Sequence, residues 1–264
     1  MGKDGVVARD PGEGPRATLL HGFAGSSDAW GDAVSACLRG AGVEAAYADL
    51  PGHGRRTGEV EPARFSLPAT LAGVRAVHGR SPRALVGYSM GGRLALHFAR
   101  RHPDLVDRLV LESASPGLEV ESERVARRVA DEKLATLLER EGIEAFVEQW
   151  EALPLFASQR TLPEDVRDEM RRGRLANDPR SLAASLRGVG TGVLPSLWAD
   201  LDGIAMPILI LVVALDVKFV EVGRRMADHL PRATLCVVEG AGHAVHRERP
   251  AEWCAAVSDF LTGP

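Results

Sequence analysis

Lysine is almost missing from this chain of 264 residues: of its 32 basic side chains, only Lys3, Lys133 and Lys218 are lysines. Because arginine is used nearly everywhere else, the presence of an arginine says little about function. The formal net charge is −4, so the chain also lacks the overall positive charge that favours binding to nucleic acid or to an anionic membrane. We therefore expect neither of these partners.

Cysteine is scarce as well, with Cys37, Cys236 and Cys254 and no C-x-x-C spacing. An odd number of unclustered cysteines is typical of a reducing compartment rather than of a disulfide framework. We expect each to be a small core residue and the protein to be cytoplasmic. The N-terminus lacks the apolar stretch of a signal peptide, and no run approaches the roughly 18 to 20 apolar residues that a membrane span needs.

Short apolar runs, by contrast, recur along the chain, and several are apolar throughout, which is typical of strands covered on both faces of a sheet. They occupy residues 17–21, 43–50, 83–89, 108–113, 208–215 and 234–240. Helix-like segments, including 28–42, 66–79 and 90–103, lie between the early runs. Strand alternating with helix predicts a mostly parallel α/β sheet flanked by helices.

The alternation stops after residue 118. Residues 119 to about 200 contain no convincing strand but several amphipathic stretches, such as 122–142 and 143–150. We predict an α/β core built from residues 1–118 and 201–264, interrupted by a helical cap insertion over 119–200. The insertion would follow the carboxyl end of a strand, which is the edge where open α/β sheets bind ligands.

The segment "GYSMG", residues 87–91, matches the G-x-S-x-G elbow that presents a serine hydroxyl above such a sheet. The two glycines are needed because the tight turn brings neighbouring backbone too close for larger side chains. With an apolar strand before it and a helix after it, the segment predicts Ser89 as a catalytic residue.

A serine hydroxyl becomes reactive when a histidine, oriented by a carboxylate, takes its proton. His243 lies on the glycine-rich loop "EGAGHAVH" after the last strand, and Asp216 ends the strand before it. The order Ser89, Asp216, His243 is that of an α/β-hydrolase triad. His246 shares the loop but lies further from the strand, and an aspartate after a strand can be a turn or N-cap residue instead.

The remaining element of such a site is an oxyanion hole, for which "LLHGFAGSSDAW" at 19–30 supplies a His-Gly pair after an early strand. The donors would be the backbone N–H groups of Phe23 and Met90. His53, in "DLPGHG", is interpreted as structural. Because the chain has no metal-ligand cluster and no glycine-rich phosphate loop, we expect no metal and no organic cofactor.

These motifs together resemble the α/β-hydrolase superfamily over nearly the whole chain, and more closely its 2-succinyl-6-hydroxy-2,4-cyclohexadiene-1-carboxylate synthase family, which acts in menaquinone biosynthesis. The finer resemblance rests on "LHGFAGSSDAW", "DLPGHG", "GYSMGGRLAL", "LVLESASPGL", "PLFASQ", "SLRGVGTG", "LDVKF" and "AGHAVHRERP". It implies a carbon–oxygen lyase that removes a ring proton from an anionic cyclohexene polycarboxylate and eliminates pyruvate. Ser89, aligned with His243 and Asp216, would then act as a base without forming an acyl-enzyme.

The resemblance also implies a set of substrate-binding residues: Tyr88, Arg93, Arg127, Trp150, Arg174 and Lys218. Arginines suit a substrate with several carboxylates because they can bind each one with two parallel hydrogen bonds. Arg128, Arg171 and Arg172 are neighbours that could replace Arg127 or Arg174. Members of the family tend to have a glycine near the end of the strand before the triad acid, whereas this chain has Val212 and Val213 there. The bulkier valines could shift the loop that carries Asp216, which puts the position of Lys218 in question.

Two other readings of these residues stay open. Ser89 could be the covalent nucleophile of a carboxylesterase, a thioesterase or a carbon–carbon hydrolase. The fold could also serve only to capture a ligand, although a complete serine, histidine and aspartate set argues against a pure binding protein.

Overall fold

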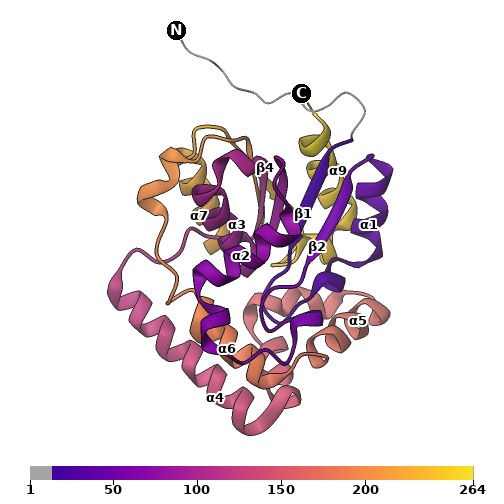
Figure 1. Ribbon diagram of the computed structural model, residues 1–264. Helices are drawn as coiled ribbons and strands as arrows, with labels where there is room; N and C mark the ends of the chain where they lie inside the picture. Colours follow the sequence, from indigo (N-terminus) through magenta and orange to yellow (C-terminus); the bar gives the residue numbers. More distant parts are fainter. Residues whose placement is uncertain (1–13, 264) are drawn as a thin grey trace.

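The computed structural model describes residues 14–263, and its centre is a single sheet of six parallel strands (Figure 1). The strands lie in the order β2-β1-β3-β4-β5-β6. Their bounds are β1 Arg16–Leu20, β2 Glu44–Ala48, β3 Arg83–Tyr88, β4 Val106–Glu112, β5 Ile208–Val213 and β6 Ala233–Val238. Each of the six apolar runs therefore overlaps one strand, which confirms the predicted parallel sheet.

Helices cover both faces of this sheet (Figure 1). On one face lie α2 (Leu67–His78), α3 (Met90–Arg101) and α7 (Val217–His229). On the other lie α1 (Gly31–Gly40), the short α8 (Val245–Glu248) and α9 (Pro250–Thr262). Burial on both faces explains why β5 reads as an unbroken apolar run.

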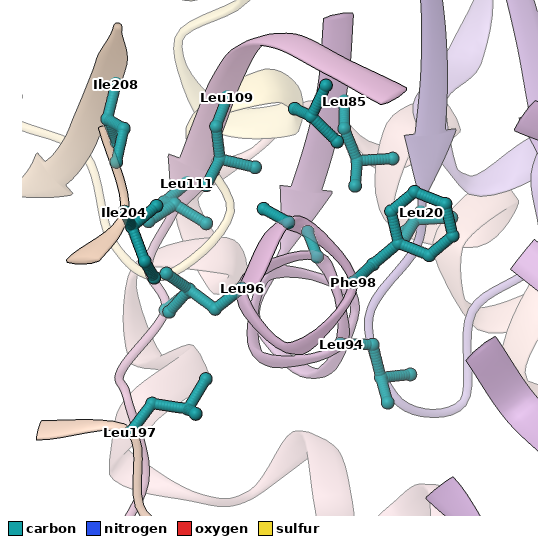
Figure 2. Close-up of a cluster of buried hydrophobic side chains, with 14 of the residues drawn as sticks. Leu20, Leu85, Leu94, Leu96, Phe98, Leu109, Leu111, Leu197, Ile204 and Ile208 are labelled. Atoms are coloured by element: carbon teal, nitrogen blue, oxygen red, sulfur yellow. The ribbon is translucent and has the colours of Figure 1, made fainter. Parts of the chain in front are cut away.

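Side chains alternate between the two cores along each strand. In β5, Ile208 and Ile210 belong to the core beneath α3, whereas Leu209 and Leu211 belong to the core beneath α9. Figure 2 shows the first core, where Leu94, Leu96 and Phe98 of α3 meet leucines of the strands. This packing fixes α3, and with it the residue immediately before the helix, against the centre of the sheet.

The predicted insertion is helical and joins β4 to β5. It contains α4 (Glu121–Glu151), α5 (Glu164–Leu175) and α6 (Pro179–Val189), which lie together along one end of the sheet (Figure 1). Gly142, with a φ of 86°, interrupts α4 at the point where the sequence pattern divides. A third hydrophobic cluster, which includes Phe146 and Leu182, packs these helices on Ala24 after β1.

The prediction for the cysteines is wrong for two of the three. Cys37 of α1 and Cys254 of α9 form a disulfide, with their Cα atoms 5.9 Å apart, and only Cys236 is free. The two residues are separated by 217 positions in the sequence, so nothing in their spacing indicated the pair. Packing of α1 against α9 on one face of the sheet brings them together. Within residues 14–263, no helix is long and apolar enough to cross a membrane.

We expect reduction of the Cys37–Cys254 disulfide to lower the free energy of unfolding by about 2–4 kcal/mol, because the bond restricts a long loop of the unfolded chain. Urea unfolding with and without a thiol reductant measures the difference. The double variant Cys37→Ser/Cys254→Ser is the control, and its unfolding should not respond to reductant. An unchanged midpoint for the wild-type protein under reduction would contradict this expectation.

Candidate active site

Ser89 lies between the end of β3 and the first residue of α3, in a backbone conformation that non-glycine residues rarely adopt. Its φ is 50°, and its N–H donates to the backbone carbonyl of Glu112 in β4 at 2.9 Å. A Cβ at position 87 would lie 2.6 Å from the carbonyl oxygen of Gly91, and one at position 91 would collide with the carbonyl of Leu20. The strained turn thus depends on both glycines of the motif and lifts the serine hydroxyl off the sheet.

His243 stands beside this serine, on the loop between β6 and α8. Its Nε2 lies 3.0 Å from Ser89 Oγ, within hydrogen-bonding distance, although 154 residues separate the two in sequence. The His243 side chain is 3% exposed. The geometry therefore allows a proton to pass between Ser89 Oγ and the imidazole, as general acid–base chemistry requires.

Asp216 stands on the far side of the same imidazole. Its Oδ2 is 3.8 Å from His243 Nδ1, longer than a hydrogen bond, and neither atom has another partner. Oδ1 accepts the N–H of Phe219 at 3.2 Å, so Asp216 is the N-cap of α7 as well. Burial opposes ionisation of this carboxyl, but His243, the Phe219 N–H and Lys218 outweigh it and hold the pKa of Asp216 below its ordinary value.

The two valines before Asp216 are accommodated inside the fold. Val212 and Val213 are fully buried at the end of β5. A Cβ at Gly223 of α7 would lie 2.8 Å from Val212 Cγ1, so the missing side chain of Gly223 provides the room for Val212. The Asp216 loop therefore faces His243 despite the bulkier residues.

The predicted oxyanion loop also lies beside Ser89. A Cβ at Gly22 would be 2.6 Å from the Tyr88 ring and 3.6 Å from Ser89 Cβ, so only glycine lets the chain before Phe23 approach so closely. Met90 is the first residue of α3, and its N–H has no carbonyl partner within that helix. Both loops that carry the predicted donors thus meet at the serine.

A cavity of about 710 Å³ lies over these residues, between the sheet edge and the cap. Of the predicted site residues, all except Arg174 line it: Phe23, Tyr88, Ser89, Met90, Arg93, Arg127, Trp150, Asp216, Lys218 and His243. Residues 14–263 contain no group of three or more histidine, cysteine or acidic side chains arranged to hold a metal ion.

Arg93 and Arg127 bring positive charge to the cavity from two sides. Arg93 lies one turn into α3, and its Nε is buried with no hydrogen-bond partner. Burial, followed by the nearby charge of Arg127, lowers the pKa of Arg93 to about 10, so it remains charged at neutral pH. Arg127 donates to Asp131 at 2.8 Å, and burial raises the pKa of that aspartate. A half-buried guanidinium whose Nε has no acceptor is suited to binding an anion.

Arg174 lies elsewhere, at a second cavity of about 490 Å³. It donates to Glu151 at 2.7 Å and to Gln159 at 2.8 Å, and its guanidinium lies over the Phe156 ring. Four aromatic residues line both cavities and so form the wall between them: Phe23, Tyr88, Trp150 and Phe156. Arg174 is thus placed on the opposite side of this wall from Ser89.

The sequence reasoning missed a fourth cation in the wall of the Ser89 cavity, which Arg93, Arg127 and Lys218 also line. Arg225 of α7 lies 3.9 Å from the centre of the Trp198 ring and forms an ion pair with Glu119. Because 29 of the 32 basic residues in the chain are arginines, no local sequence pattern distinguished Arg225 from the others. Only the approach of α7 to the start of the cap identifies it.

His53 is buried in the loop after β2 and lines neither cavity. Its Nδ1 lies 2.9 Å from the carbonyl of Pro51, and its ring centre lies 5.0 Å from that of His21. Burial, reinforced by the neighbouring His21, lowers the pKa of His53 to about 3. The interpretation of His53 as structural agrees with this environment.

The low pKa of His53 predicts a pH-dependent stability. The unfolded residue takes a proton near pH 6.5 and the folded one only near pH 3, so between these values the unfolded state binds more protons and is favoured as the pH falls. Between pH 7 and pH 5, His53→Asn, which can still donate to Pro51, should lose about 2 kcal/mol less stability than wild type. Urea unfolding at both pH values measures this; equal losses in the two proteins would contradict it.

The sheet, the strained serine elbow and the histidine loop together define an α/β hydrolase. The alpha/beta hydrolase family model matches residues 19–257. A solved enol-lactonase from Burkholderia xenovorans LB400 shares this fold, with a TM-score of 0.77 and 21% identity over 96% of this chain and 94% of that one.

Other relatives are much closer in sequence. A Bacillus subtilis (strain 168) protein, provisionally assigned as a 2-succinyl-6-hydroxy-2,4-cyclohexadiene-1-carboxylate synthase, is 40% identical over 98% of this chain and 96% of its own. The synthase of that name from Salmonella paratyphi B is 34% identical over 94% of each chain. The structure of MenH from S. aureus has a TM-score of 0.85 and 33% identity, covering 94% of this chain and 93% of that one. This chain belongs to the 2-succinyl-6-hydroxy-2,4-cyclohexadiene-1-carboxylate synthase family.

Proposed function

We propose that this protein is a carbon–oxygen lyase that eliminates pyruvate from 2-succinyl-5-enolpyruvyl-6-hydroxy-3-cyclohexene-1-carboxylate to give 2-succinyl-6-hydroxy-2,4-cyclohexadiene-1-carboxylate. Family membership supports the reaction. The single structural observation that carries it is the 3.0 Å approach of His243 Nε2 to Ser89 Oγ at the floor of a cavity lined by cations.

The names of the two compounds define the proton transfer. Moving from a 3-ene to a 2,4-diene requires that C2 lose a proton and C5 lose its oxygen substituent, with the double bond shifting between them. C2 bears the succinyl ketone, so negative charge develops on that ketone oxygen as the proton leaves. The enolpyruvyl oxygen departs with the C–O electron pair, and protonation of the enol's methylene carbon gives pyruvate.

The residues at the cavity floor suit this step. Ser89 Oγ takes the C2 proton while its own proton passes to His243 Nε2, and Asp216 stabilises the imidazolium that forms. The N–H groups of Phe23 and Met90 would donate to the ketone oxygen as charge develops there. Because Ser89 acts as a base, no covalent acyl-enzyme is needed.

The cations suit the substrate's carboxylates. Arg93 offers a guanidinium whose buried Nε has no acceptor, and Arg127 and Lys218 line the same cavity. Charge-assisted hydrogen bonds to carboxylates are about twice as strong as neutral ones, so these groups would orient the ring above Ser89. Tyr88 and Trp150 would pack against the ring as part of the aromatic wall.

Arg174 would reach a substrate carboxylate only from the second cavity, across that wall. Its two present partners, Glu151 and Gln159, already hold the guanidinium. A binding role for Arg174 therefore requires that the wall open or that the substrate extend past it.

The cap over residues 119–200 is proposed to act as a lid on the core, which the structure describes over residues 14–118 and 201–263. It carries Arg127 and Trp150, and it closes the cavity opposite Ser89. Excluding water at this point would strengthen the electrostatic contacts and protect the developing enolate from stray protonation.

A cytoplasmic location belongs to the same proposal and rests on the water-soluble, multiply charged substrate. The Cys37–Cys254 disulfide does not support it, because disulfides are rare in reducing compartments.

Incubation with the enolpyruvyl cyclohexene substrate should release pyruvate, and Ser89→Ala should reduce kcat by about 10²- to 10⁴-fold, as expected for loss of a general base. Pyruvate formation measures the rate, and circular dichroism checks that the variant is folded. Mass spectrometry during turnover should show no acyl adduct on the wild-type serine.

The competing hydrolase reading makes the opposite predictions, because the same Ser89–His243 geometry can activate a nucleophile. Absence of pyruvate release, together with a transient serine adduct during turnover of simple esters or thioesters, would replace the lyase with a hydrolase.

Replacing Arg93 with alanine should lower kcat/KM for the charged substrate by about 10- to 100-fold, because a charge-assisted hydrogen bond is lost. Arg187→Ala is the matched control: Arg187 lies on α6, pairs with Glu132 and Glu139, and lines neither cavity. Equal kinetics for Arg93→Ala and the control would remove Arg93 from the anion site.

A further inference from the structure

A fully buried carboxylate, Glu112, connects the two halves of the proposed proton-transfer pair. Glu112 is the last residue of β4 and is 0% exposed. Its backbone carbonyl accepts the N–H of Ser89 at 2.9 Å. Its side chain, by contrast, forms hydrogen bonds with the segment that follows His243.

Three N–H donors surround this carboxylate. Oε1 accepts the His246 backbone N–H at 3.2 Å and the ring Nδ1 of His246 at 2.7 Å. Oε2 accepts the indole Nε1–H of Trp253 in α9 at 3.0 Å. Three donors supply the stabilisation that a carboxylate removed from water requires.

The imidazole of His243 packs among the rings of Tyr88, Phe219 and Phe156, whose centres lie 5.5, 5.1 and 5.9 Å from its own. Its distance to Asp216 is 3.8 Å, too long for a hydrogen bond to hold the ring. Glu248 fixes the backbone on either side of it, accepting the N–H groups of Gly242 at 2.7 Å and Ala244 at 3.1 Å. Glu248 lies in α8, directly after the loop that carries His243, and a contact within this continuous segment cannot fix the loop relative to the serine.

We propose that Glu112 is a positioning residue: through its carbonyl it fixes Ser89, and through its carboxylate it fixes the His243 loop at the distance that proton transfer needs. The Tyr88 ring occupies the space between the two attachments, with its centre 5.5 Å from that of His243 and 4.8 Å from that of His246. Glu112 lines neither cavity and touches no reacting atom, so its effect would pass through the Ser89–His243 geometry.

Glu112→Gln tests this role because an amide has one acceptor where the carboxylate has two. An amide oxygen facing His246 puts its NH₂ group against the Trp253 N–H, so two donors collide. We expect kcat to fall about 10- to 100-fold, the effect of a misplacement near 1 Å, with KM within twofold of wild type. Glu112→Gln/Trp253→Phe, which removes the colliding donor, should recover most of the loss.

Leu261→Ala is the control for stability alone. Leu261 is buried near the end of the same α9 helix but makes none of these hydrogen bonds. Assayed at a temperature where all variants are folded, it should lower the melting temperature while kcat stays at the wild-type value. If Glu112→Gln loses no more kcat than this control, or if it raises KM with kcat unchanged, Glu112 has no positioning role. Should Glu112→Gln not fold, the double variant and Glu112→Asp, which shortens the connection, are compared with the control in the same way.

The kcat assay of Glu112 rests on the proposed function, because it uses the proposed substrate. A second assay, which needs no substrate, tests the role of Glu112 separately. Phenylmethanesulfonyl fluoride sulfonylates an activated serine: the Oγ–S bond forms, the S–F bond breaks, and the hydroxyl proton passes to the imidazole. The inactivation rate should fall with Glu112→Gln and recover in the double variant. If the wild-type protein releases no pyruvate, the proposed lyase function fails, and the inactivation rates alone decide the role of Glu112. Equal inactivation rates in all folded variants would overturn the positioning role of Glu112.

Discussion

The hydrogen-bonding distance of 3.0 Å between Ser89 and His243 depends on how accurately the parallel sheet aligns its carboxyl edge. Ser89 follows β3, Glu112 ends β4, Asp216 follows β5 and His243 follows β6. These four strands are neighbours in the sheet, so the four residues lie along its carboxyl edge. Parallel strands place all their carboxyl ends at the same edge, and the helices on both faces keep that edge rigid. The chemistry proposed for the site thus rests on the register of the sheet.

The strain at Ser89 shows how this alignment is maintained. A left-handed serine persists only where surrounding contacts outweigh its cost, of the order of 1–3 kcal/mol. Here those contacts are the glycine packing around the elbow, the burial of α3 and the hydrogen bond to the Glu112 carbonyl. The same α3 also places Arg93 one turn from the serine, so the packing that forces the strained turn positions a cation beside it as well.

The cap supplies what the sheet edge cannot. It lines the space above Ser89 with apolar and aromatic side chains and adds Arg127. In the proposed reaction these side chains would partly exclude water from the cations, which strengthens their electrostatic contacts. The aromatic wall divides this space into two cavities. Arg174, grouped with Arg93 and Arg127 by resemblance, lies beyond that wall because α5 and η5 (Pro154–Thr161) fold back together around Glu151 and Gln159.

The sequence by itself determined the six strands, the helical insertion and the order of Ser89, Asp216 and His243, because apolar runs and glycine turns are local signals. Even the break at Gly142 could be read from the pattern. Only the tertiary structure decided which distant residues meet: the Cys37–Cys254 disulfide, the placement of Arg225 and Arg174, and the attachment of the His243 loop to Glu112. These contacts depend on how helices pack on opposite faces of the sheet and how the cap folds over its edge, and no spacing along the chain records such packing.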